Sequence, residues 1–147
     1  MKVVILAGGL GTRMPEYTTK IPKPMVRIVN KPILKHIIDH YVKYDFCNFY
    51  LALGYKSEII KKYIKSTKFS KNVKINLIDT GQKTMTGGRI KRLEKILIKD
   101  DHFCLTYGDG LCNVNIKKLV NYHKKNKKIA TVTAVKEPNR FGVLDIG

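Results

Sequence analysis

The sequence contains few acidic residues and no long apolar run. Only 11 of its 147 residues are Asp or Glu, against 29 Lys or Arg, which gives a formal net charge of +18. No apolar stretch reaches the roughly 20 residues that a membrane-spanning helix needs. The apolar run near the N-terminus is also too short, and too soon followed by glycines, for a secretory signal. We therefore expect neither a membrane-spanning segment nor a signal peptide.

Arginine is scarce among the basic residues, which argues against nucleic acid as a partner. Proteins that read nucleic acids use the arginine fork for bidentate contacts and place aromatic residues beside it. The lysines here are scattered, as in the pairs Lys61-Lys62 and Lys117-Lys118, which is typical of a solvated surface. Among the 29 basic residues, the arginines are Arg13, Arg27, Arg89, Arg92 and Arg140. We expect no nucleic-acid or membrane partner, only a general attraction for anionic substrates.

Patterns typical of disulfides and metal centres are also missing. Cys47, Cys104 and Cys112 are odd in number and lack metal-ligand spacing. The first two lie in apolar runs, so we expect buried thiols in a protein of the reducing cytoplasm. His36 and His40 have the i, i+4 spacing of some zinc ligands, but no Glu follows His36 and no third ligand is evident. Packing or solvent contact is the better interpretation of both histidines.

The most informative segment is a strand that runs directly into a glycine-rich loop. Val3–Ala7 is a continuous apolar run typical of a buried parallel strand, and Gly8-Gly9-Leu10-Gly11-Thr12-Arg13 follows it. Glycines let backbone N–H groups approach a phosphate, and Arg13 adds a charged fork suited to phosphate oxygens. Lys23, between two prolines, offers a second cation from a stiff loop. The pattern predicts a polyphosphate-binding site.

Two better-known phosphate motifs do not fit this loop. A Walker A loop would end in Gly-Lys-Ser or Gly-Lys-Thr, and none is present. The dinucleotide fingerprint would need a glycine at Met14 followed at once by a helix, but Pro15 comes next. The alternative is a glycine turn that merely redirects the chain; Arg13 and the Pro22-Lys23-Pro24 segment favour the binding site.

The rest of the chain alternates between strand and helix patterns. Apolar periodicity predicts strands at 47–53, 73–78, 103–107 and 129–135, with a further strand starting at 141. It predicts helices at 31–44 and 115–123. It also predicts one helix capped by Ser57 that runs to 64, and one that begins at Gly87-Gly88 and runs to 97. No internal repeat or linker is evident. We expect an α/β fold, a mostly parallel Rossmann-like sheet flanked by helices, in one domain.

Several motifs together resemble the signature of the sugar-phosphate nucleotidyltransferases. They are Leu6 to Arg13 with Thr18, Pro22-Lys23-Pro24-Met25, Asp79-Thr80-Gly81, Met85-Thr86-Gly87-Gly88-Arg89, Thr106-Tyr107-Gly108-Asp109-Gly110, and Arg140 to Ile146. The later segments are most similar to the cytidylyl branch, which uses CTP and glucose 1-phosphate. The resemblance covers essentially the whole chain and implies the nucleotidyltransferase fold.

The resemblance implies a reaction and a set of site residues. A sugar 1-phosphate would attack the α-phosphorus of a nucleoside triphosphate and expel pyrophosphate, with Mg²⁺ as cofactor. The implied catalytic residues are Arg13, Lys23 and the metal ligand Asp109, which could otherwise be a plain turn aspartate. The implied nucleotide-binding residues are Leu6, Ala7, Gly8, Gly9, Leu10, Gly11, Thr12, Arg13, Lys23, Thr84, Arg89 and Gly108. Gly142 is implied in sugar binding. For Arg89 the alternative is a surface charge on a helix.

Two departures from the family pattern leave alternatives open. The family's later Glu-Lys-Pro and Asn-Gly-Gly segments and its second metal-binding aspartate do not occur, so residues 1–147 correspond to the nucleotide-binding part without the sugar-binding part. The stretch between Ile64 and Asp79 is shorter than in cytidylyltransferases. The chain is thus an enzyme part, homo-oligomeric in its complete form, or a nucleotide-binding module without turnover. The base could also be thymine or uracil.

Overall fold

Four parallel strands form the sheet of the computed structural model, which describes residues 1–11 and 19–135. The strands are β1 (Lys2–Ala7), β4 (Asn48–Leu53), β5 (Lys74–Asp79) and β6 (Phe103–Tyr107), in the order β5-β4-β1-β6. Each neighbouring pair is parallel. In β1, residues 3–7 are all buried, because helices cover both faces of the sheet there. The predicted α/β class with a parallel sheet is confirmed.

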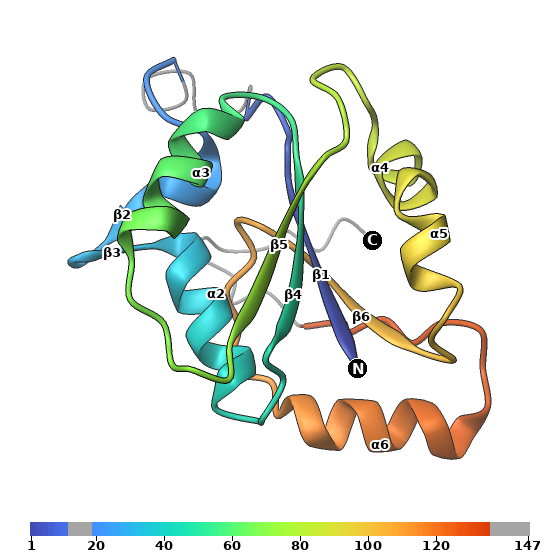
Figure 1. Cartoon of the computed structure of the whole chain (residues 1–147). Coiled ribbons are helices and arrows are strands. Elements are labelled where there is room, and N and C mark those ends of the chain that lie inside the picture. Colours follow the sequence, from blue (N-terminus) through green and yellow to red (C-terminus); the bar gives the residue numbers. More distant parts are fainter. Residues whose placement is uncertain (12–18, 136–147) are drawn as a thin grey trace, which may run out of the picture. The chain divides into compact units, whose positions relative to one another are not determined.

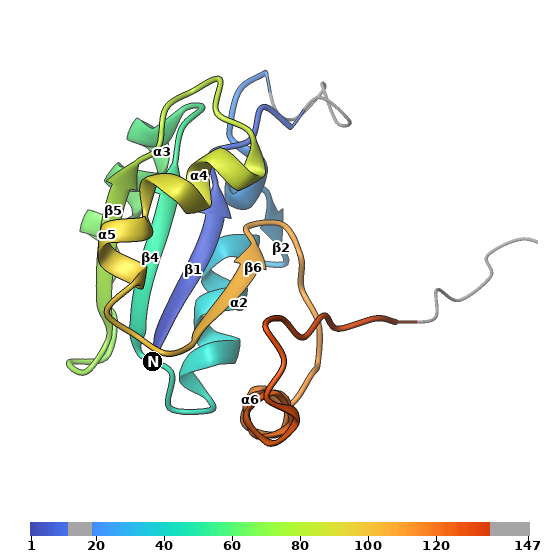
Figure 2. The ribbon, with the colours of Figure 1, turned by 90° about the vertical axis from the view of Figure 1, so that its right-hand side faces the viewer.

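Helices lie on both faces of this sheet, as Figures 1 and 2 show from two directions. One face carries α2 (Ile33–Val42) and α3 (Ser57–Ser66), and the other carries α4 (Thr86–Arg92) and α5 (Glu94–Leu97). On the α4–α5 side, Leu93 and Leu97 pack against apolar residues of the central strands. Those strand residues are Val4, Leu6 and Ala52. This cluster therefore fixes the α4–α5 layer to the strands whose ends carry the site.

The connection from β1 to α2 contains a one-turn 3-10 helix and a small hairpin. The 3-10 helix η1 spans Lys23–Met25, and β2 (Arg27–Ile28) pairs antiparallel with β3 (Lys31–Pro32). The helix predicted from Lys31 begins only at Ile33, because Lys31 belongs to β3 and Pro32 is the N-cap with extended backbone. A proline lacks the N–H that a helix interior would use.

Other predicted boundaries differ in detail from the structure. Ser57 is the first residue of α3 and not its cap; Lys56, in the left-handed region with φ 49°, precedes the helix. The single helix predicted up to Leu97 is divided at Leu93, whose ψ of 0° ends α4 and begins α5. Cys47 and Cys104 are half-buried, not buried, and Cys112 is exposed.

The chain divides into two compact units, Met1–Val114 and the part from Asn115 on. In the second unit, α6 (Ile116–Asn126) begins where the Asn115 side chain accepts a hydrogen bond from Lys118 N at 3.0 Å. The strand predicted at 129–135 is wrong: this stretch is irregular and its apolar side chains are exposed. Its Thr131 hydroxyl lies 2.9 Å from His123 Nδ1, so the stretch is held by its own helix and pairs with no described strand.

Several predictions fall outside the described residues: Thr12, Arg13, Thr18, Gly142 and the strand expected from Phe141. Within the residues that are described, no helix has the length and apolar character needed to cross a bilayer.

Candidate functional site

The carboxyl ends of the strands meet at one edge of the sheet. The register places Ala7 beside Leu53, Leu53 beside Asp79, and Leu6 beside Tyr107. The segments that follow these strands contain the predicted motifs Gly8–Gly11, Thr80–Gly81 and Gly108–Asp109, and also Gly54, which was not predicted as a site residue. In parallel α/β sheets, ligands bind at this edge. The sheet therefore brings together motifs that lie up to one hundred positions apart in the sequence.

The turn after β1 is closed on one side and open on the other. Gly8 is buried, and its carbonyl accepts a hydrogen bond from Tyr55 N at 3.1 Å. Gly9 is exposed, and a Cβ placed on it would meet no atom within 4 Å. Leu10 is 49% exposed, and Gly11 has a φ of 68°, which favours glycine. The turn thus presents backbone at Gly9 and Leu10 to an approaching ligand.

Arg89 lies under this turn and is buried, with 4% of its surface exposed. Its Nη2 donates to Gly8 O at 2.7 Å and to Gln82 O at 3.3 Å. Its Nη1 donates to Leu53 O at 3.0 Å, to Thr80 Oγ1 at 2.7 Å and to Gly81 O at 2.8 Å. One guanidinium therefore ties together the ends of β1, β4 and β5. The alternative of a surface charge on a helix is wrong.

Glycines make room for this guanidinium. A Cβ on Gly8 would lie 2.2 Å from Arg89 Nη1, and one on Gly54 would lie 2.6 Å from the same atom. A Cβ at either position would also lie 2.8 Å from a backbone atom of a neighbouring segment. We define Gly8, Gly54, Thr80, Gly81 and Arg89 as the arginine clamp. Gly8 and Gly54 therefore allow the Arg89 guanidinium to pack against the backbone, in addition to any role in binding phosphate.

The electrostatics of the clamp are those of a buried cation among carbonyl dipoles. Burial lowers the pKa of Arg89, the nearby Arg92 lowers it further, and Asp79 raises it. An arginine keeps its proton even so. Arg92 Nη1 also donates to Thr80 O. Because both guanidinium groups donate to carbonyl oxygens, their hydrogen bonds fix the loop between β5 and α4.

Lys23 and Asp109, predicted from separate motifs, form an ion pair. Lys23 Nζ lies 2.5 Å from Asp109 Oδ2, and the two side chains are 24% and 28% exposed. Asp109 comes directly after β6 and Gly108, and Lys23 is the first residue of η1 in the connection from β1 to α2. The structure therefore places the two predicted reactive groups side by side.

The backbones that carry this pair are packed against each other. Gly108 is buried, and its N–H donates to Leu6 O at 2.9 Å. A Cβ on Gly108 would lie 2.8 Å from Pro24 Cγ, next to Lys23 in the sequence. Pro22 is fully buried and its carbonyl accepts from Met25 N at 2.8 Å. Glycine at 108 thus permits the close contact that sets the spacing of the ion pair.

Asp109 has the chemistry of a ligand for a divalent cation. Magnesium is usually held by one or two carboxylates together with substrate phosphates. The Asp109 side chain is 28% exposed, so a ligand can reach its carboxylate from solvent. In the described residues, no group of three or more His, Cys, Asp or Glu could hold a metal by itself. Asp109 fits a metal that is shared with a phosphate ligand.

The remaining predicted residues lie around these features. Leu6 and Ala7 are buried at the end of β1. Thr84 is half-buried, and its Oγ1 would lie 2.9 Å from a Cβ on Gly81, so it borders the arginine clamp. The sequence reasoning did not single out Gly54 or Arg92. Gly54 directly follows an apolar strand, a signal that could have identified it.

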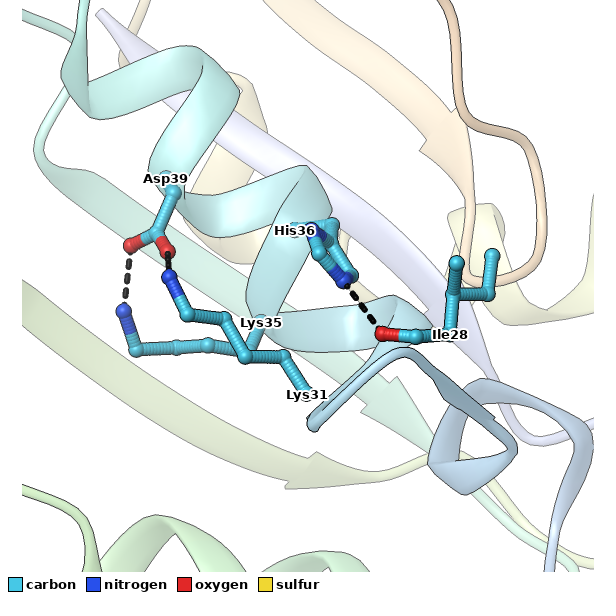
Figure 3. A network of polar contacts seen from close by, with 5 residues as sticks. All are labelled: Ile28, Lys31, Lys35, His36 and Asp39. Atoms are coloured by element: carbon cyan, nitrogen blue, oxygen red, sulfur yellow. Dashed lines mark hydrogen bonds and ion pairs between the residues drawn. The ribbon is translucent and has the colours of Figure 1, made fainter.

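The two histidines with zinc-like spacing have structural partners. In Figure 3, His36 points toward the Ile28 carbonyl, which its Nε2 contacts at 3.1 Å. His40 Nε2 contacts Val114 O at 2.8 Å. Asp39, between them on α2, pairs with Lys31 at 3.5 Å and with Lys35. These contacts tie α2 to the hairpin and to the segment after β6, as the packing interpretation predicted.

Comparisons of the sequence with known proteins give consistent results. A family model described as nucleotidyl transferase matches residues 2–147. Glucose-1-phosphate cytidylyltransferase of Salmonella typhimurium is 42% identical over 166 aligned residues, covering 99% of this chain and 65% of that protein. The mannose-1-phosphate guanyltransferase of Hypocrea jecorina is 35% identical over 147 residues, covering 98% of this chain and 40% of that protein. The chain therefore spans 65% or less of the length of these relatives.

Solved structures with the same fold also match. HddC from Yersinia pseudotuberculosis, complexed with GMP-PN, gives a TM-score of 0.70 at 35% identity, covering 83% of this chain and 53% of that one. A UDP-glucose pyrophosphorylase complexed with UDP-glucose gives 0.72 at 20% identity, covering 86% and 54%. The second likeness concerns the fold alone.

Proposed function

The chain belongs to the nucleotidyl transferase family, and on that premise we propose that it is the nucleotide-binding part of a sugar-1-phosphate nucleotidyltransferase. The nucleoside triphosphate is CTP and the acceptor is glucose 1-phosphate. The similarity to glucose-1-phosphate cytidylyltransferases supports this choice of substrates. The observation that carries the proposal is the pairing of Lys23 with Asp109 at the same edge of the sheet as the open Gly9–Leu10 turn.

In the proposed reaction, an oxygen of the sugar phosphate attacks the α-phosphorus, and the bond to the β-phosphate oxygen breaks. Pyrophosphate leaves and the nucleotide-sugar remains. Nucleophile and leaving group are both anions already, so positioning and charge neutralisation are the main requirements. No residue is needed to remove a proton.

Each site residue has a part in this scheme. The backbone from Leu6 to Thr12 borders the nucleotide, and Lys23 neutralises the α-phosphate as charge develops. Arg13 holds the triphosphate and the departing pyrophosphate. Asp109 holds Mg²⁺, which when bound supplies Lewis-acid activation and a template for the phosphates. Gly108 and Thr84 line the site, and Gly142 leaves room for the sugar.

We assign a positioning role to Arg89. Its guanidinium donates to five oxygens of the protein itself, so it orders the turn at Gly8 on which the nucleotide lies. The complete enzyme would act as a homo-oligomer in the reducing cytoplasm, consistent with three free thiols. For residues 1–147 alone we propose nucleotide binding with little turnover, because Asp109 is the single carboxylate that we assign to the metal.

Calorimetric titration of the chain with CTP, dTTP, UTP, ATP and GTP in the presence of Mg²⁺ tests the substrate. We expect CTP to bind most tightly. A clear preference for dTTP or UTP would contradict the cytidylyl assignment, and no binding of any triphosphate would contradict the proposed function.

Pyrophosphate release from CTP and glucose 1-phosphate tests the activity. We expect the 147-residue chain to release it far more slowly than the ordinary enzymatic range of about 1–10³ per second. Turnover within that range would show that this chain already contains the complete catalytic site.

A further inference from the structure

We propose that Lys23 competes with the metal for Asp109 and is released from it only when a nucleotide phosphate takes the lysine. This inference rests on the proposed function, because it assumes that Asp109 is the metal ligand. It adds a property of the same site, namely that metal and nucleotide binding are coupled through one ion pair. The geometry of the pair carries it.

The ion pair occupies one of the two carboxylate oxygens through which Asp109 would hold a metal. Lys23 Nζ lies 2.5 Å from Asp109 Oδ2, a short charge-assisted contact. A magnesium ion binds a carboxylate oxygen at about 2.1 Å. A divalent cation at that distance and the ammonium group would lie on the same carboxylate and repel each other. Metal binding therefore requires Lys23 to move away or to share the carboxylate at a cost.

The backbone holds the two groups together in the absence of ligand. The Pro22 and Pro24 rings fix η1, and Pro24 packs against Gly108, which in turn is bonded to Leu6 O. These contacts hold the two backbone segments together. Rotation of the long, flexible lysine side chain, which is 24% exposed, separates the pair without a shift of either segment.

A nucleotide phosphate gives the lysine an alternative partner. A lysine ammonium is a compact charge that binds phosphate as readily as carboxylate. When Lys23 turns to the α-phosphate, Asp109 is left with an uncompensated charge and becomes available to the metal. By thermodynamic linkage, each ligand then favours the other. Without nucleotide, the pair keeps the metal affinity of Asp109 low.

Manganese binding to the nucleotide-free chain, measured by electron paramagnetic resonance of the free ion, tests this inference. The variants are Lys23→Met and Lys23→Gln, which remove the ammonium, and Lys62→Met, which removes an exposed lysine on α3. We expect each Lys23 variant to bind Mn²⁺ at least tenfold more tightly than the wild type. Lys62→Met, with the same change in net charge, should alter the affinity less than twofold.

Asp109→Asn separates the inference from the function on which it rests. If Asp109→Asn abolishes the Mn²⁺ binding of the wild type while the Lys23 variants bind as the wild type does, the competition is disproved and the metal site stands. Asp109→Asn is also combined with each Lys23 variant. If it leaves Mn²⁺ binding unchanged in the wild type and in both Lys23 variants, the proposed metal site is itself wrong. Equal tightening by Lys23→Met and Lys62→Met would also overturn the inference, since bulk charge would explain it.

Discussion

Two cations lie at the carboxyl edge of the same sheet, and their surroundings differ. Arg89 is 4% exposed and donates to Gly8, Leu53, Thr80, Gly81 and Gln82. Lys23 has a quarter of its side chain exposed and contacts one carboxylate. Arg89 has both terminal nitrogens committed to the protein, whereas the contact of Lys23 with the described residues is a single ion pair that a ligand could replace.

The difference distinguishes a cation that holds the site together from a cation that can bind a ligand. A planar guanidinium satisfies several fixed carbonyls at once, which suits a clamp. A lysine on a flexible stem exchanges partners readily, which suits a group that follows a phosphate through a reaction. The +18 net charge of the chain does not distinguish them; their partners do.

The largest effect is expected when the arginine clamp is removed. Arg89→Met removes a charged donor from five oxygens, and a hydrogen bond to a charged group is worth about 1.5–3 kcal/mol, so we expect the unfolding free energy to fall by at least about 3 kcal/mol. Urea denaturation followed by circular dichroism measures it. Lys91→Met is the control, because Lys91 is 74% exposed and, within the described part of the chain, forms its ion pair with the exposed Glu94; its cost should stay below about 1 kcal/mol. A similar loss of unfolding free energy in both variants would contradict the structural role of Arg89.

A smaller effect is expected from crowding the clamp. Gly8→Ala would place a methyl group 2.2 Å from Arg89 Nη1 and 2.8 Å from Gly54 N, and overpacking of this kind costs about 1–3 kcal/mol. Gly9→Ala meets no atom within 4 Å, so its stability should change by less than about 0.5 kcal/mol. Gly9→Ala should instead weaken CTP binding, since the open turn is where the nucleotide approaches. If Gly9→Ala were more destabilising than Gly8→Ala, the packing of Gly8 against Arg89 would not be what limits this turn.

The smallest effect on stability is expected at Lys23. A partly exposed ion pair contributes up to about 1 kcal/mol, so Lys23→Met should lower the unfolding free energy by no more than that. The same denaturation experiment compares it with Arg89→Met. A loss at Lys23 as large as the loss at Arg89 would mean that the lysine, too, is structural.

The strands and the place of the site could be predicted from the sequence, but the hydrogen-bond partners of Arg89 could not. A continuous apolar run identified β1, because a buried parallel strand needs apolar residues on both faces, and apolar patterns also identified β4, β5 and β6. Parallel order then implied that Gly8, Asp79 and Asp109 share one edge. Arg89 could not be separated from a surface charge, because its burial depends on glycines at positions 8 and 54 that meet only in the folded chain.

The strand predicted at 129–135 failed for a related reason. Its β-branched residues fit a strand, but a strand needs a neighbour to satisfy its backbone, and periodicity alone does not supply one. Similarly, the ion pair between Lys23 and Asp109 follows from the contact of Pro24 with Gly108, which no local pattern encodes. Roles that depend on side chains meeting across the sheet edge required the structure.

Calorimetric titration with CTP in EDTA, comparing Lys23→Met with Lys62→Met, tests the central claim most directly. The claim is that Lys23 is the exchangeable cation of a nucleotide site, and the absence of metal isolates its contact with phosphate. A charge-assisted contact is worth about 1.5–3 kcal/mol, so Lys23→Met should raise the dissociation constant about tenfold or more, while Lys62→Met leaves it within twofold of the wild type. Equal weakening by the two variants would contradict the account, because bulk charge would then hold the nucleotide.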